Sequence, residues 1–156
     1  MAGIDLSTAG VTINYGVETV AGTKPTAFIK IPGAKSIPEL NPEPKTYEST
    51  TLDALEYTTY VQGLKDIGGA LAFKFNMTEV FQTTWGSVVT AYTTAITTNL
   101  TTWFQVIVPG LTKSFYFSGS PATLGLSAIE VGSILETTVY VTPTAVKGWD
   151  VKVIPS

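Results

Sequence analysis

Residues 71–92 read LAFKFNMTEVFQTTWGSVVTAY, and in this segment a strand pattern passes directly into a helix pattern. From Leu71 to Met77 apolar side chains alternate with small or polar ones, which is the period-two repeat of a strand with one buried face. The next apolar residues recur three and four positions apart and form one stripe on a helix; they are Phe81, Trp85, Val88, Val89 and Tyr92. Asn76, with Glu79 three residues later, is the expected N-cap. The segment therefore predicts a helix that packs its stripe against a sheet.

Strand patterns continue on both sides of this segment. They occur at residues 26–31, 45–51, 57–61, 103–108, 114–118, 134–142 and 151–154. In the strand at 134–142 we expect Leu135, Val139 and Val141 to face inward. Residues 1–24 contain several glycines, which weaken a strand, and we interpret them as an N-terminal arm with at most a loose strand. We predict a single domain over residues 1–156 that is mainly β (α+β): a β-sandwich or open barrel with one flanking helix.

The chemical composition excludes several classes of function. The 156 residues include no cysteine and no histidine, all nine basic residues are lysines, and the net charge is −3 at pH 7. Without histidine or cysteine the chain lacks the usual catalytic triads and zinc ligands, so we expect no enzyme, metal or cofactor. The lack of arginine in an acidic chain argues against specific nucleic-acid binding. We find no signal peptide and no apolar run of the roughly 20 residues that a membrane span needs, and we expect a protein made in the cytoplasm without membrane contact.

A proline-rich, acidic segment precedes the strand and helix. Residues 31–53 read IPGAKSIPELNPEPKTYESTTLD, and Pro38, Pro42 and Pro44 favour extended backbone that is neither helix nor central strand. Residues 39–66 contain six acidic residues but only two lysines, which gives this segment a net charge of about −4. The acidic residues are Glu39, Glu43, Glu48, Asp53, Glu56 and Asp66. A segment of this kind is either a solvated loop or an acidic surface that steers assembly.

The order of motifs along the chain resembles the major tail tube protein of long-tailed bacteriophages. The similar region begins with FIKIPGAKSIPELNPEPKTYESTTLDALEYTTYVQGLKDIGGALAFKFNMT at residues 28–78. Within it a strand ends in an IPG turn at 31–33, followed by SIPEL at 36–40, TTLD at 50–53 and YVQGLKDIGG at 60–69. The last part, FYFSGSPATLG at 115–125 and LETTVYVTPT at 135–144, also fits.

The resemblance implies a structural virion protein, made in the host cytoplasm, that forms stacked rings of six copies. The hollow tube would carry DNA out of the capsid without binding it specifically. Its partners would be further copies of itself and the tape-measure, tail-tip and tail-terminator proteins. Residues 33–66 would be an extended loop that contacts a neighbouring subunit or ring through Ile37, Pro38, Leu40, Tyr47, Leu52 and Tyr57.

Two alternatives remain open at this stage. One is the tube protein of a contractile tail or injection system, in which the same fold lies inside a sheath. The other is a monomeric β-sandwich module for adhesion or carbohydrate binding, which would use an exposed Trp103 or Trp149.

Overall fold

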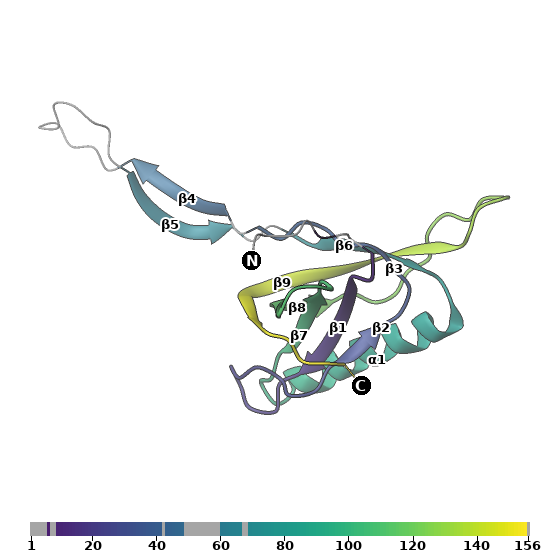
Figure 1. Cartoon of the computed structure of the whole chain (residues 1–156), viewed down its shortest axis with the longest axis horizontal. Helices are drawn as coiled ribbons and strands as arrows, with labels where there is room; N and C mark the ends of the chain where they lie inside the picture. The colour runs from purple at the N-terminus through teal and green to yellow at the C-terminus, as the bar shows by residue number, and fades with distance from the viewer. Residues whose placement is uncertain (1–5, 7–8, 42, 49–59, 67–68, 156) are drawn as a thin grey trace, which may run out of the picture.

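The computed structural model describes residues 6, 9–41, 43–48, 60–66 and 69–155 (Figure 1). The strands are β1 (Thr12–Val17), β2 (Ile29–Ile31), β3 (Ala34–Ser36), β4 (Glu43–Glu48), β5 (Tyr60–Asp66), β6 (Leu71–Asn76), β7 (Thr102–Ile107), β8 (Lys113–Pro121) and β9 (Glu136–Val151). The helix α1 (Glu79–Ile96) lies between β6 and β7. The fold is mainly β with one helix, as the sequence predicts.

Seven of the strands form an antiparallel sheet that is nearly closed into a barrel. Their order is β2-β1-β7-β8-β9-β6-β3, so β2 and β3 lie at its two ends. These two strands are also consecutive in the chain, joined only by Pro32 and Gly33. Gly33 has a φ of 79°, a left-handed conformation that glycine adopts without strain. The IPG turn therefore ends β2, as the sequence predicts, and carries the chain from one edge of the sheet to the other.

Strand β6 supplies the centre of the barrel core. Phe73 and Phe75 are each 1% exposed, and Phe73 pairs in register with Val139 of β9. Val139 and Val141 point inward as predicted. The prediction for Leu135 is wrong: this side chain is 40% exposed, because β9 begins only at Glu136.

The helix covers the core with the predicted stripe. Phe81, Trp85 and Val88 are buried, Val89 packs against the same cluster, and the hydroxyl of Tyr92 accepts a hydrogen bond from Ser120 at 2.6 Å. The N-cap, however, is Thr78 and not Asn76, with Thr78 Oγ1 accepting from the Phe81 N–H at 3.1 Å. Asn76 is unavailable because it ends β6, where its N–H donates to the carbonyl of Gly33.

The prediction of a loosely structured N-terminal arm is wrong for the residues that form β1. This strand lies inside the sheet, paired with β2 on one side and β7 on the other. Gly16, which reads as a weak point in a strand, is required here, because a Cβ at this position would lie 2.6 Å from the carbonyl oxygen of Ala27. Close packing of two backbone segments thus explains the glycine.

Gly86 has open space around it, unlike Gly16, and comparison of the two glycines tests the close packing described for Gly16. Gly86 lies on the exposed side of α1, and an added Cβ would meet nothing within 4 Å. We expect Gly86→Ala to raise the free energy of unfolding by about 0.5–1 kcal/mol, because alanine restricts the unfolded chain and favours helix. Urea denaturation followed by circular dichroism measures this change. Gly16→Ala is the matched control and should destabilise; a stabilising Gly16→Ala, or a neutral Gly86→Ala, would contradict the packing described.

Candidate assembly surfaces

Strands β4 and β5 form a hairpin that projects from the barrel, which we call the projecting hairpin (Figure 1). They make a separate two-stranded sheet and pair with no other strand in the described part of the chain. Pro44 lies in β4 next to a register shift between Pro44 and Thr46, which fits a residue that cannot donate to a strand ladder. The segment predicted as an extended loop over 33–66 thus contains a short strand, β3, and this hairpin, and its contact with a neighbouring subunit stays a prediction.

The residues predicted as loop contacts are divided between the barrel and the hairpin. Ile37 and Leu40 pack against the chain's own core, and Pro38 is half-buried beside them. These three precede β4 and so lie on the barrel and not on the projecting hairpin, and their contact with a neighbouring copy stays a prediction. Tyr47 is in β4, in register with Val61. Leu52 and Tyr57 lie outside the described residues.

The predicted acidic surface is divided in the same way. Glu39 is exposed and accepts a hydrogen bond from Asn41 Nδ2 at 2.7 Å. Glu43 and Asp66 occupy directly paired positions at the base of the projecting hairpin. Glu48 ends β4, paired with Tyr60, whereas Asp53 and Glu56 lie outside the described residues. A continuous acidic surface stays a prediction.

A second segment, residues 122–135, projects from the other end of the barrel, and we call it the apolar arm (Figure 1). Four aliphatic side chains on it are largely in solvent: Leu126 (75% exposed), Ile129 (68%), Val131 (103%) and Ile134 (73%). An exposed apolar cluster of this kind usually marks an interaction surface. The sequence did not show it, because LGLSAIEVGSIL has neither the period of a strand nor that of a helix and gives no indication of which side chains are covered.

Hydrogen bonds fix the root of the apolar arm to the barrel. The indole Nε1 of Trp85 donates to the carbonyl oxygen of Ala122 at 2.9 Å. The backbone N–H of Met77 donates to the carbonyl oxygen of Leu135 at 3.0 Å. Ser127 Oγ accepts from the Thr138 N–H at 3.2 Å. The arm therefore has a defined position although it contains no regular strand.

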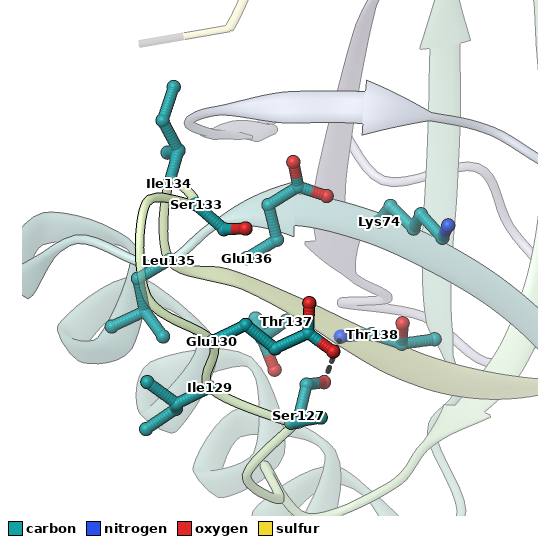
Figure 2. Close-up of a pocket in the computed structure, with 11 residues that line it drawn as sticks. Lys74, Ser127, Ile129, Glu130, Ser133, Ile134, Leu135, Glu136, Thr137 and Thr138 are labelled. Carbon is teal, nitrogen blue, oxygen red and sulfur yellow. Dashed lines mark hydrogen bonds between the residues drawn. The ribbon is translucent and has the colours of Figure 1, made fainter.

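The inner side of the apolar arm carries charged and polar side chains beside apolar ones. It borders a hollow of about 340 Å³ over the start of β9, into which Lys74, Glu130 and Glu136 contribute charged groups. Lys35 Nζ donates to Glu136 Oε1 at 2.6 Å and lowers the pKa of that carboxyl. Figure 2 shows Ser127 and Glu130 on this inner side, and Ile134 and Leu135 pointing away from β9. Ile129, Ile134 and Leu135 also border this hollow, and the side chains of Ile129 and Ile134 are nevertheless largely exposed to solvent.

A second hollow, the apolar pocket, lies at the base of the projecting hairpin. It has a volume of about 210 Å³ and no charged side chain lines it. Its walls include Ile37, Leu40, Leu71, Phe73, Phe115 and Trp149. Trp149 is 54% exposed and meets Phe115 edge-on, with ring centres 5.5 Å apart.

The tryptophans differ in their availability to a ligand. Trp103 is only 6% exposed, and its indole Nε1 donates to Glu18 at 2.9 Å. A carbohydrate platform on Trp103 is therefore a wrong prediction, and Trp149 is the exposed ring of the two. Within the described residues no three His, Cys, Asp or Glu side chains are placed to hold a metal ion. In the same residues no helix has the length and hydropathy needed to cross a membrane.

Comparison with known proteins gives a match at the level of fold. No protein-family model and no curated protein sequence matches the chain. The chain is similar to a chain of the solved structure titled "Cryo-EM structure of the anti-feeding prophage (AFP) baseplate, 6-fold symmetrised", with a TM-score of 0.60 and 9% sequence identity. The similarity covers 94% of this chain and 96% of that chain. The two therefore share a fold over nearly their entire length.

Proposed function

We propose that this chain is a structural subunit of a phage-type tail and that its copies form rings, six-membered by analogy, which stack into a hollow tube. The projecting hairpin is the observation that carries this function. A two-stranded hairpin without further strands is marginally stable in water, and its free edges invite pairing with another chain. A neighbouring copy that adds strands or packing to the hairpin would supply the missing contacts.

The fold comparison supports the same function. The similar chain belongs to a prophage baseplate that was reconstructed with six-fold symmetry, and the motif order resembles a tail tube protein. A subunit with a fold shared over 94% of its length fits a ring-forming tail component. In this role the chain catalyses no reaction and binds no cofactor, and its location is the virion tail.

The charge of the chain fits passage of DNA through the tube. The nine lysines are outnumbered by twelve acidic residues, and arginine is absent. A surface with few cations releases few counterions from DNA and therefore binds it weakly. DNA would slide through the lumen, while the tape-measure, tail-tip and tail-terminator proteins would be the partners at the inside and ends of the tube.

A second candidate is the tube or baseplate protein of a contractile tail or injection system. It is favoured by the source of the similar fold, which is a baseplate and not a long flexible tail. A sheath gene beside the gene for this chain, or a sheath around tubes in electron micrographs, distinguishes it from a non-contractile tail.

Deletion of the projecting hairpin tests the proposed function. We replace residues 42–68 with a short Gly–Ser linker and examine the purified protein by negative-stain electron microscopy and sedimentation at rising concentration. We expect rings or tubes from the wild type and a folded monomer from the deletion variant, because among the described residues β4 and β5 pair with no strand of the barrel. Gly86→Ala is the control and should assemble, since its change lies on the exposed side of α1.

Two results would contradict different parts of this proposal. Tubes of normal diameter from the deletion variant would overturn the role of the hairpin while leaving tube formation standing. A wild-type chain that stays monomeric and binds glycans would favour an adhesion module with Trp149 in its site.

A further inference from the structure

We infer that the apolar arm of one copy inserts into the apolar pocket of the next copy. This inference rests on the proposed function, because it names the contact by which copies associate. Both surfaces are apolar, and within the described structure of one copy neither is covered. The arm offers Leu126, Ile129, Val131 and Ile134, whereas the pocket offers a wall of aliphatic and aromatic side chains.

The arm cannot reach the pocket of its own copy. Strand β6 has Leu71 and Phe73 at the pocket and ends at Asn76, which pairs with Glu136 at the root of the arm. The five residue steps from Leu71 to Asn76 span about 16 Å at roughly 3.3 Å per residue, and the arm points away from that end (Figure 1). The two surfaces therefore lie at opposite ends of the barrel, and only a second copy can bring them together.

The size and chemistry of the two surfaces match. A cavity of about 150 Å³ is large enough for a benzene molecule, so the pocket, at about 210 Å³, has room for one or two branched aliphatic side chains. The pocket is lined by no charge, and the arm carries a single ionisable residue, Glu130, on its inner side. Insertion of the outer side of the arm would thus bury apolar area without burying a charge.

The contact uses two different surfaces of the chain, so it is heterologous. Such a contact closes into a ring when its rotation completes a full turn and otherwise extends into a filament. It would also place the arm of one copy at the base of the next copy's projecting hairpin, because Leu40 and Leu71 flank that hairpin in sequence and line the pocket. The arm and hairpin would then act at one junction between copies.

Cysteine cross-linking tests the contact directly, and the chain has no cysteine of its own. We mix a Val131→Cys variant with an Asn41→Cys variant, since Asn41 lies at the rim of the pocket, and treat the mixture with a short bis-maleimide at rising concentration. We expect a cross-linked dimer that contains one of each variant. The matched control replaces Val131→Cys with Val80→Cys, an equally apolar and 65% exposed position on α1, and should give at least tenfold less cross-linking.

An arm variant gives the second measurement. Val131→Asp combined with Ile134→Asp should weaken self-association, measured by sedimentation, about tenfold or more, and Val80→Asp should leave it unchanged. A specific cross-link without rings or tubes would uphold the arm–pocket contact and overturn the tube function. Tubes that form normally from the arm variant, without a specific cross-link, would overturn the contact and leave the tube function standing. If neither a specific cross-link nor tubes are observed, both the arm–pocket contact and the tube function are overturned.

Discussion

Trp85→Ala is expected to lower the free energy of unfolding by about 3–5 kcal/mol, the usual cost of removing a large aromatic side chain from a core. Trp85 is 1% exposed and lies in the stripe of α1 that covers the barrel. Its ring centre is 6.2 Å from that of Phe81 and 6.4 Å from that of Phe75. The substitution would open a cavity between helix and sheet and also leave the carbonyl of Ala122 without its indole donor.

Trp85→Phe separates these two contributions. Phenylalanine retains most of the packing but not the hydrogen bond to Ala122, so we expect a smaller loss of about 1–2 kcal/mol. Urea denaturation followed by far-ultraviolet circular dichroism is the suitable measurement, because removal of a tryptophan alters the fluorescence signal itself. A loss below about 1 kcal/mol for Trp85→Ala would mean that α1 does not cover the core as described.

The position of Ala122 extends this prediction to assembly. Ala122 is the first residue of the apolar arm, and its N–H also donates to the carbonyl of Tyr140 at 2.8 Å. Loss of the indole donor in Trp85→Phe would loosen the root of the arm while leaving the barrel folded. Under the arm–pocket contact, this variant should cross-link less efficiently through Val131→Cys than the wild-type background does.

The parts of the fold that the sequence predicts are those with a local period. Phe73 and Phe75 alternate with Ala72 and Lys74, so β6 can be identified without knowledge of its neighbours. The stripe of α1 is equally local. The N-cap depends on a longer-range contact, since Asn76 is kept in β6 by its hydrogen bond to the carbonyl of Gly33 in the turn between β2 and β3.

The parts that the sequence does not predict depend on tertiary contacts. Gly16 weakens the strand pattern of β1, and only its close approach to Ala27 shows why a central strand contains it. Ile37 and Leu40 share a proline-rich segment with the projecting hairpin, yet they pack on the barrel because the chain turns outward only after them. The apolar pocket combines residues from β6, β7, β8 and β9 with this segment, and no short pattern records that arrangement.

Glu18 is the second residue for which we expect a large effect, because it is a carboxylate held inside the protein. It is 3% exposed. Its Oε1 accepts from the Thr101 N–H at 2.9 Å, and its Oε2 accepts from Trp103 Nε1 at 2.9 Å and from the Gly22 N–H at 3.0 Å. It thereby joins the end of β1 to the start of β7 and to the turn that follows β1.

The hydrogen bonds determine the ionisation of Glu18. Burial alone would raise the pKa of its carboxyl, but the donors from Thr101, Trp103 and Gly22 outweigh burial and lower the pKa below its ordinary value of 4.5. A group whose pKa is lower in the folded state stabilises the fold above its unfolded pKa and loses this effect as the pH falls through the folded value. The stabilisation by Glu18 should therefore be complete near neutral pH and decrease below about pH 4.5.

Glu18→Gln tests this assignment. A glutamine amide has one acceptor oxygen in place of two, so at least one buried donor loses its partner, and we expect a loss of about 2–3 kcal/mol at pH 7. The difference between wild type and variant, measured by urea denaturation from pH 7 to pH 3, should shrink at the acidic end, because a protonated Glu18 resembles the amide. The lowered pKa values of Glu136 and Asp150 also make stability pH-dependent, but they are present in both proteins and cancel in the difference.

Glu136→Gln is the matched control, because Glu136 is an acid of the same type in an exposed pair with Lys35. Its substitution should change stability little at any pH, since exposed ion pairs are weak. If the loss caused by Glu18→Gln were the same at pH 3 as at pH 7, the ionised carboxylate would not be the stabilising group. The role of Glu18 would then be one of shape alone, and the connection between β1 and β7 would have to depend on their strand pairing and on the burial of Trp103.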